Sequence, residues 1–266
     1  MNVEISNREV LFQKGGCLAG RYVLDDPFKP HFAILNTTAG HNVTLVSPAD
    51  HRHHKGLMYA LRCADLNFWE EDPDGGTCGV QEVLDTHPIV NGIRQTLLWR
   101  ALEGDRPTYR ESREITCTLA ADGGGYHWLW RTRREALRNH RLIKSEWSMA
   151  LPDGRKINYH GLGLRLPWMW AFNNDAFCGI EIAGEQTPAL AASGQNGSAV
   201  TWWGRIDGQW NPTAASVTIR QAQDFTWYAL KNDLPYLAVG PSNLNELEVQ
   251  VNQQFEESYE IIVADR

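Results

Sequence analysis

Several features that would point to common classes of protein are missing from this sequence. There is no excess of basic residues, since 25 lysines and arginines face 32 aspartates and glutamates, giving a formal net charge of -7. A nucleic-acid-binding protein is expected to carry a basic face, so this charge disfavours nucleic acid as a partner. No window approaches the run of about 18 apolar residues that a spanning helix needs, so we expect no membrane partner.

Cysteine pairs, targeting segments and common catalytic signatures are also lacking. The five cysteines are scattered and odd in number, without a Cys-x-x-Cys pair, which favours free thiols in a reducing compartment. The opening MNVEISNREV has no cationic leader followed by an apolar run. P-loop, Gly-x-Ser-x-Gly and His-Glu-x-x-His motifs are absent. We therefore expect a cytoplasmic protein that belongs to none of these enzyme classes.

A hydrophobic period of two dominates the chain. Apolar residues alternate with polar ones over 114–120, 216–220, 225–230, 247–251 and 258–263. Turn-forming residues recur between such runs, at 121–125, 152–154, 193–198 and 206–209. This pattern predicts an all-β fold, a large antiparallel β-sandwich, and we expect one domain over residues 1–266.

Two local stretches depart from this pattern. A short helix is expected near 64–72, although no segment holds a helical period beyond about ten residues. The basic stretch 131–141 is interpreted as a solvated strand-and-turn face, because it contains Glu135 and the chain as a whole is acidic.

The segment SPADHRHHKG, residues 47–56, concentrates three of the nine histidines. If the backbone is extended, His51 and His53 share one face and His54 points to the other. Imidazoles at this spacing can converge on a divalent metal ion, given a further ligand such as Asp50 or Glu70. The sequence therefore makes a metal cofactor at His51 and His53 one hypothesis.

A second hypothesis needs no metal. Neutral histidine titrates near pH 6.5, which suits proton transfer on a sugar by His53 or His54. A structural turn, in which the imidazoles only hydrogen-bond the backbone, is the alternative.

An acidic and aromatic stretch follows at 65–79. Trp69 could stack on a sugar ring, as the high count of eleven tryptophans also suggests, while Glu70 and Glu71 hydrogen-bond its hydroxyls. Asp72 and Asp74 add further carboxylates. The alternative is a solvated acidic loop with Trp69 in the core.

The third stretch, NYHGLGLRLP at 158–167, reads as a strand. Alternation would place Arg165 on one face with Tyr159, Gly161 and Gly163, leaving room for a ligand, and His160 on the face of the leucines. Arg165 could bind a carboxylate or a sugar oxygen. The aromatic run 167–175 would line a cleft or belong to the core.

These motifs together resemble a bacterial family labelled "methane oxygenase PmoA-like". The matching residues are Lys29–His31, Asp50–Leu57, Asn67–Trp69 and the Gly-Leu-Gly-Leu-Arg-Leu-Pro run at 161–167. The label itself misleads, because a methane oxygenase subunit is a membrane protein. The resemblance implies a role in sugar catabolism and a galactose-mutarotase-like supersandwich that holds the ligand on its concave face.

The resemblance carries site residues over only in part. His53, His54, Lys55, Phe68, Trp69 and Arg165 match the family pattern. The chain departs from it at His31, where tyrosine is usual, and at Val80 and Gln81, where a histidine is expected.

We therefore predict an enzyme that transfers a proton on a carbohydrate. In the most concrete version it cleaves a glycoside oxidised at C3 by elimination, with His53, His54 and Glu70 as catalytic residues. Lys55, Glu71, Trp69, Tyr159 and Arg165 would bind the sugar. A mutarotase or epimerase, a non-catalytic carbohydrate-binding protein and a structural sandwich are the alternatives, and exposed aromatics make a homodimer plausible.

Overall fold

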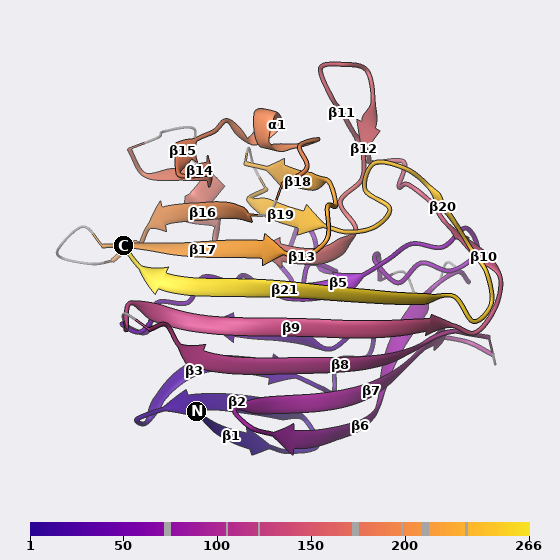
Figure 1. Cartoon of the computed structure of the whole chain (residues 1–266), viewed down its shortest axis with the longest axis horizontal. Coiled ribbons are helices and arrows are strands. Elements are labelled where there is room, and N and C mark those ends of the chain that lie inside the picture. The colour runs from indigo at the N-terminus through magenta and orange to yellow at the C-terminus, as the bar shows by residue number, and fades with distance from the viewer. Residues whose placement is uncertain are drawn as a thin grey trace.

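The computed structural model describes residues 1–71, 76–104, 106–121, 123–171, 176–197, 199–208, 213–231 and 234–266. Two large antiparallel sheets are stacked face to face in this part of the chain (Figure 1). The predicted all-β sandwich is therefore confirmed. Each sheet mixes strands from distant parts of the sequence, so the sheets complete one another across a shared core.

The eight-stranded sheet combines the N-terminal strands with three from the second half of the chain. Its order is β1 (Asn2–Ile5), β2 (Glu9–Lys14), β3 (Cys17–Val23), β4 (His31–Leu35), β5 (Leu57–Ala60), β13 (Gly161–Arg165), β19 (Tyr236–Val239) and β18 (Trp227–Leu230).

The nine-stranded sheet covers the other side of the core. Its order is β15 (Glu185–Gln186), β14 (Cys178–Ile182), β16 (Ala199–Arg205), β17 (Ala214–Gln221), β21 (Gln254–Asp265), β9 (Gly125–Ala136), β8 (Pro107–Leu119), β7 (Gly92–Ala101) and β6 (Gly79–Ile89).

Smaller elements complete the fold. Two short pairs join β10 (His140–Leu142) to β20 (Leu247–Val249) and β11 (Met149–Ala150) to β12 (Lys156–Ile157). The described helices are a 3-10 turn, η2 (Trp168–Ala171), and α1 (Ala189–Ala192). Neither they nor any other described segment makes a helix with the length and apolar character to cross a membrane.

Strand β9 shows why the alternating pattern produces two different faces. Trp128 and Trp130 are buried between the sheets, whereas Arg131 and Arg133 are exposed on the outer face. Successive side chains of a strand point to opposite faces, so one strand can supply both. The prediction of a solvated face over 131–141 is nevertheless wrong at Arg134, which is buried between the sheets.

Buried charges between the sheets are paired. Arg134 forms an ion pair with Glu257, and the Nε of Arg113 donates to Glu111 at 2.7 Å. Arg113 also donates to the Tyr22 hydroxyl at 2.7 Å. A buried charge is tolerated when it is paired and hydrogen-bonded, and these contacts meet that condition.

The short helix expected near 64–72 is also wrong over its described residues, 64–71, which form bends and isolated bridges. The side-chain oxygen of Asn67 accepts hydrogen bonds from the backbone N–H groups of Trp69 and Glu70, at 3.0 and 3.1 Å. An asparagine side chain that binds the backbone two or three residues ahead favours a turn over a helix.

Candidate functional site

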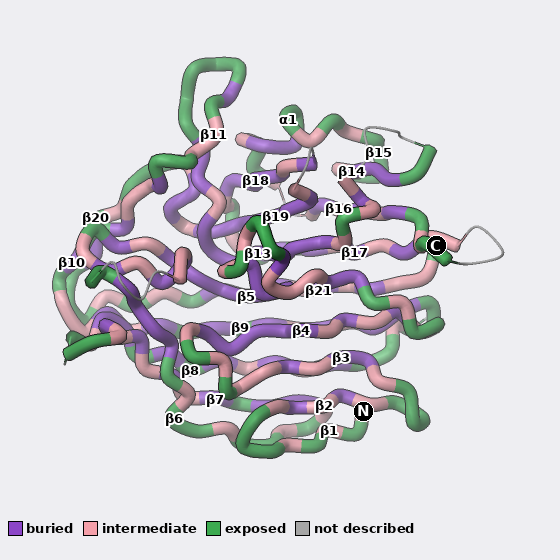
Figure 2. The backbone as a smooth tube through the Cα atoms, turned by 180° about the vertical axis from the view of Figure 1, so that it is seen from behind, coloured by how far each residue is buried: buried purple, intermediate pink, exposed green. Residues whose placement is uncertain are grey.

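The outer face of the eight-stranded sheet carries a second apolar cluster, apart from the core between the sheets. On β5, Leu57 and Tyr59 face the core while Met58 and Ala60 face outward. Strand β19 alternates in the same way, which places Tyr236 on the outer face. Figure 2 views the molecule from this side, with β5, β13 and β19 largely buried beneath the segments that cross them. These segments build the candidate site.

The segment around the three histidines is a compact turn, not an extended strand. We call residues 47–55 the histidine turn. Its backbone bonds join Ser47 N to His54 O at 2.7 Å, His51 N to Pro48 O at 3.0 Å and His54 N to His51 O at 3.0 Å. The extended backbone assumed from the sequence is therefore wrong, because these bonds fold the segment back on itself.

This turn brings the three imidazoles together. The ring centroids of His51 and His54 lie 4.8 Å apart, those of His53 and His54 lie 4.6 Å apart, and those of His51 and His53 lie 5.8 Å apart. His54 also stacks on Tyr236 at 4.9 Å, which ties the turn to β19. His54 thus joins the other two histidines and does not face away from them.

The histidines open onto a cavity of about 410 Å³, which we call the histidine cavity. Residues singled out in the sequence account for half of its described lining, namely Asp50, His51, His53, His54, Glu70 and Tyr159. The sequence did not single out the other lining residues, Trp147, Tyr228, Leu230, Leu234 and Tyr236. The predicted residues Lys55, Trp69, Glu71 and Arg165 are not among the described lining.

Asp50 and His51 form the one carboxylate–imidazole pair among the described lining residues. The Nδ1 of His51 lies 2.6 Å from Asp50 Oδ2, and both side chains are about one-third exposed. A carboxylate accepts only, so Nδ1 donates and the Nε2 of a neutral ring is left as a proton acceptor. The hydrogen bond from His51 holds the pKa of Asp50 below its usual value, against an opposing effect of burial.

His53 and His54 experience a different environment. Burial lowers the pKa of His53 to about 3, and the charge of Lys29 acts in the same direction. Burial also holds the pKa of His54 well below its usual value, with smaller contributions from the other two histidines and from Arg165. Both rings are therefore neutral at physiological pH, and they are suited to exchanging hydrogen bonds with a polar ligand.

Glu70 also lines the cavity and belongs to a small hydrogen-bonded network. The Tyr159 hydroxyl lies 3.2 Å from Glu70 Oε1 and 2.7 Å from Ser145 Oγ. Burial and the neighbouring Glu70 charge raise the pKa of Tyr159, so its hydroxyl keeps its proton. The second oxygen of Glu70, Oε2, is buried without a hydrogen-bond partner among the described residues. This network brings a protonated hydroxyl and a carboxylate together at the cavity.

Trp69 is a support for the site. It is fully buried, and its ring packs 5.4 Å from both Tyr159 and His160 and 5.7 Å from Tyr236. The aromatic surface open to a ligand belongs instead to Trp147, whose side chain is 74% exposed at the cavity.

Lys55 and Glu71 belong to a buried network of charges behind the histidine turn. Lys55 Nζ lies 3.1 Å from Asp26 and 3.2 Å from Glu71, and Lys29 Nζ lies 3.1 Å from Glu71. Lys29 also donates to the Trp69 carbonyl at 2.7 Å. Two cations and two carboxylates balance here, so this network anchors both loops of the site.

The face predicted for His160 is wrong. Its ring packs against Trp69 and its Nδ1 contacts Asn158, on the outer side of the sheet, whereas Leu162 and Leu164 face the core. Gly161 has a φ of +99°, a conformation that interrupts the strand alternation directly after His160. Arg165 does lie on the outer side, as predicted, and its guanidinium carbon sits 4.5 Å above the Trp168 ring.

The described residues include no group of three or more His, Cys, Asp and Glu side chains arranged to hold a metal ion. The Nδ1 contact with Asp50 leaves His51 Nε2 open, but His51 and His53 have no third ligand of this kind among the described residues. The metal hypothesis therefore stays a prediction. Asp72, Asp74 and residues 172–175 lie outside the described residues, so their predicted roles stay predictions.

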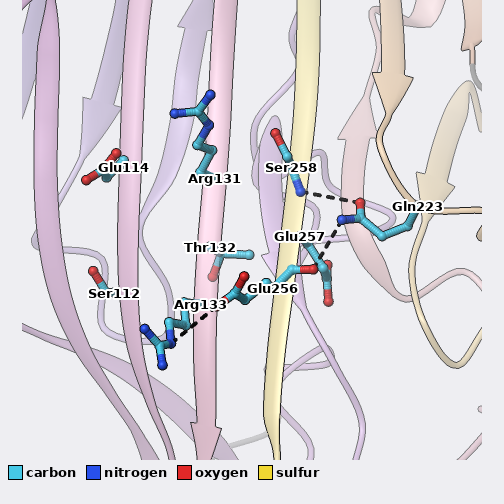
Figure 3. A pocket seen from close by; sticks show the side chains of 9 residues that line it. All are labelled: Ser112, Glu114, Arg131, Thr132, Arg133, Gln223, Glu256, Glu257 and Ser258. Atoms are coloured by element: carbon cyan, nitrogen blue, oxygen red, sulfur yellow. Dashed lines mark hydrogen bonds and ion pairs between the residues drawn. The ribbon is translucent and has the colours of Figure 1, made fainter.

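A hollow of similar size, about 440 Å³, lies on the outer face of the nine-stranded sheet over β8, β9 and β21 (Figure 3). Its described lining contains no histidine and no aromatic residue. Its polar groups bind one another, since Gln223 accepts from the Ser258 N–H at 3.3 Å and donates to the Glu256 carbonyl at 3.1 Å. The hollow therefore offers little chemistry, and the histidine cavity is the better candidate.

Comparisons with known proteins yield one matching family model and a set of similar solved structures. No curated protein matches the sequence. Similar solved structures include galactose 1-epimerase from Lactobacillus acidophilus NCFM, with a TM-score of 0.41 and 9% identity over 95% of this chain and 96% of that chain. A galactose mutarotase-like protein from Clostridium acetobutylicum gives 0.40 and 7% over 100% and 98%.

A third similar structure is much longer than this chain. The 4-alpha-glucanotransferase of Thermococcus litoralis gives a TM-score of 0.39 and 9% identity over 99% of this chain, which spans 39% of that enzyme. With all three scores below 0.5, we infer no activity from these similarities. The PmoA-like label stays a prediction that none of these comparisons tests. A model of another description, a family of unknown function called DUF6807, matches residues 9–266, and the chain therefore belongs to that family.

Proposed function

We propose that the protein is a carbohydrate-active enzyme in which His51, oriented by Asp50, removes a proton from a sugar bound in the histidine cavity. The observation that carries this proposal is the 2.6 Å contact between His51 Nδ1 and Asp50 at the wall of that cavity. A carboxylate that accepts from one ring nitrogen fixes the tautomer, so that the other nitrogen can act as a general base.

His53 and His54 take supporting roles in this proposal. Their lowered pKa values make them weak bases, so they serve better as hydrogen-bond partners of sugar hydroxyls than as the primary proton acceptor. Their packing against His51 also fixes the ring of the base.

Tyr159, also in the lining of the cavity, acts as the acid. Tyr159 keeps its proton and contacts Glu70, so the pair can protonate an oxygen that leaves the sugar. Trp147, exposed at the cavity, offers an apolar face on which the C–H groups of a sugar ring would rest.

The most concrete reaction is elimination from a glycoside already oxidised at C3. The C2 proton passes to His51, and the electron pair of the C–H bond forms an enolate with the C3 ketone. The enolate then collapses to a C1–C2 double bond while the C1–O bond breaks. The departing oxygen takes the proton of the Tyr159 hydroxyl, so the step needs no oxidant beyond the one that made the ketone.

A second hollow next to the histidine cavity can hold the aglycone, the group attached to the sugar. Leu230 lines the histidine cavity and also a second hollow of about 640 Å³, whose lining includes Met149, Pro188 and Leu190. An apolar aglycone would extend past Leu230 into this second hollow.

The test compares a substitution in the cavity with one outside it. His51→Gln should lower turnover of a 3-oxidised glycoside by about 10²-fold or more, the usual contribution of a general base. His87→Gln is a matched control, because His87 pairs with Asp85 at 2.5 Å on β6, outside the described lining of the cavity. Turnover is followed by release of the aglycone. Equal loss in both variants, or no loss in either, would contradict the proposal.

A mutarotase or epimerase is the second candidate, because the histidines share one cavity with Glu70, whose Oε2 has no hydrogen-bond partner among the described residues. It predicts that the protein speeds anomer exchange of an unoxidised sugar, which NMR measures directly. A non-catalytic sugar-binding protein would instead keep its affinity in the His51→Gln variant and show no turnover at all.

A further inference from the structure

Arg165 differs from the other buried arginines of the protein. Arg113 and Arg134 are fully buried and each contacts a carboxylate. Arg165 is equally buried, with 0% of the residue exposed, yet none of its three nitrogens has a hydrogen-bond partner among the described residues. Its guanidinium is covered by the Trp168 ring. A buried charge without a partner is costly, so its presence needs an explanation.

The position of Arg165 relates it to the histidine cavity. Arg165 on β13 is the direct antiparallel partner of Tyr236 on β19. Residues directly opposite each other in such a pair project from the same face of the sheet. Arg165 therefore projects from the same face as Tyr236, which lines the cavity. His54 stacks on Tyr236, and the charge of Arg165 further lowers the pKa of His54.

Among the described residues, no carboxylate forms an ion pair with Arg165. Burial lowers its pKa to about 10, so the side chain is still positively charged at physiological pH. Asp50 is the acid whose charge acts on it, but Asp50 already accepts the hydrogen bond of His51. Lys29 and Lys55 are neutralised by Glu71 and Asp26. Arg165 is therefore a buried cation without an ion pair in the described part of the chain, which matches a negatively charged ligand.

We propose that Arg165 receives the carboxylate of an acidic sugar bound in the histidine cavity, so that the protein selects hexuronates or their glycosides over neutral sugars. The planar guanidinium presents paired N–H groups that match the two oxygens of a carboxylate. Access requires the covering side chain to move, and Trp168, 46% exposed, is placed to do so. The inference rests on the proposed function for the location of the ligand and adds its charge.

A carboxylate at Arg165 would also act on His54, which packs against the base His51. Its negative charge would offset the Arg165 charge, which adds to the effect of burial in lowering the pKa of His54. In a hexuronate, the C–H next to the carboxylate is acidified once Arg165 neutralises that group. His51 would take this proton, and the electron pair of the C–H bond would form a double bond to the next carbon. The carbon–oxygen bond at that carbon would break, and the leaving oxygen would be protonated by Tyr159. Such a substrate needs no prior oxidation, in contrast to a neutral glycoside.

The test measures binding by thermal melting and calorimetry on the full chain. The probes are glucuronate and galacturonate, the corresponding neutral sugars, the uronate methyl esters and inorganic phosphate. We expect the two uronates to bind at least about tenfold more tightly than the neutral sugars and esters, a ratio of the size expected for one charge-assisted contact. Phosphate should bind no better than the neutral sugars, because it lacks the sugar ring that the histidine cavity would hold.

Arg165→Met should abolish this preference and leave neutral-sugar affinity unchanged. Because Arg165 has no hydrogen bond to lose among the described residues, and Met can still pack against Trp168, the ligand-free variant should melt at the same or a higher temperature than the parent. Arg205→Met is the matched control, since Arg205 lies over the Phe177 ring at 5.3 Å and is not part of the described cavity lining. Equal affinities for acidic and neutral sugars, a preference that survives Arg165→Met, or phosphate binding as strong as uronate binding would each overturn the inference.

The inference and the proposed function fail separately. If uronates bind through Arg165 but His51→Gln leaves their conversion unchanged, the carboxylate site stands and the catalytic role of His51 does not. If neutral 3-oxidised glycosides are converted through His51 but uronates bind no better than neutral sugars, the catalytic role of His51 stands and the carboxylate site does not.

Discussion

Three histidines within four residues have different chemical characters because their contacts differ. His51 is about one-third exposed and bonded to a carboxylate, whereas His53 is half-buried and His54 buried among cations and other imidazoles. Burial penalises the charged form of an imidazole, and a carboxylate at one nitrogen fixes the tautomer of the ring. Residue type alone therefore did not separate the candidate base from its neighbours, and the sequence favoured His53 and His54 for that role.

Buried histidines should make the fold sensitive to acid. Burial lowers the pKa of His160 to about 3 and that of His31 to about 4, from 6.5. Between these values and 6.5 the unfolded chain binds more protons than the folded chain, so the free energy of unfolding falls as the pH falls. The maximum loss is about 1.4 kcal/mol per pH unit for each such histidine.

Melting temperatures recorded from about pH 8 to about pH 4 should therefore stay nearly level down to about pH 6.5 and decline below it. His160→Gln should flatten the decline, because glutamine cannot be protonated, while the exposed control His87→Gln should follow the parent. A His160→Gln profile parallel to that of the parent would show that His160 does not carry the effect.

At the scale of elements, the sequence predicted strands well and the connecting segments poorly. The alternating runs at 114–120 and 216–220 lie inside β8 and β17, because a strand with one face in the core must alternate. The run predicted at 258–263 is longer in the structure, since β21 begins at Gln254. Its first four residues, Gln254–Glu257, contain one apolar side chain, that of Phe255, and therefore show no alternating pattern.

Connections are set by contacts that are distant in sequence or by single backbone angles. The histidine turn is closed by Ser47 N–His54 O and packs on Tyr236, neither of which a local pattern reveals. His160 changed face because of the positive φ at Gly161. Trp147 was missed because nothing in the sequence separates an exposed tryptophan from the ten others, most of which are buried.

Ser145 should hold Trp147 in the position from which it contacts the sugar. Its Oγ lies 2.7 Å from the Tyr159 hydroxyl and 3.2 Å from the Trp147 N–H that it accepts from, so it links Trp147 to the acid side of the site. Ser145→Ala should weaken sugar binding several-fold and cost about 1 kcal/mol of stability, the usual worth of such hydrogen bonds. Calorimetric titration and thermal melting measure the two effects.

Ser112→Ala, on the outer face of the nine-stranded sheet, is the control and should change neither quantity. Unchanged sugar affinity in Ser145→Ala would mean that Trp147 is held in place without this serine, or does not contact the sugar.

At the scale of the whole molecule, the two sheets enclose charges as well as apolar side chains. Glu111 accepts from Arg113, from the Thr132 hydroxyl at 2.6 Å and from the Trp99 N–H at 2.7 Å. These partners come from β7, β8 and β9, so the carboxylate links three neighbouring strands inside the sandwich. The resulting network fixes the register of one sheet from within the core.

Glu111→Gln should destabilise the protein by about 3–5 kcal/mol, because it leaves the buried Arg113 without its counter-charge. Denaturant unfolding monitored by tryptophan fluorescence measures this loss. Glu114→Gln is the control on the same strand, since Glu114 is only partly buried and its partner Arg94 is exposed. If both variants unfold at the same denaturant concentration, the buried network contributes no more than a surface ion pair.

The place of β21 in the nine-stranded sheet has a consequence for how the protein is made. This strand lies between β17 and β9, and its residues Gln254–Asp265 pair with both (Figure 1). Strands β6 to β9 and β14 to β17 are synthesised earlier, yet they cannot join into one sheet before β21 arrives. During translation each half would expose an open edge until residue 265 leaves the ribosome, so the nascent chain depends on protection from aggregation for almost its entire synthesis.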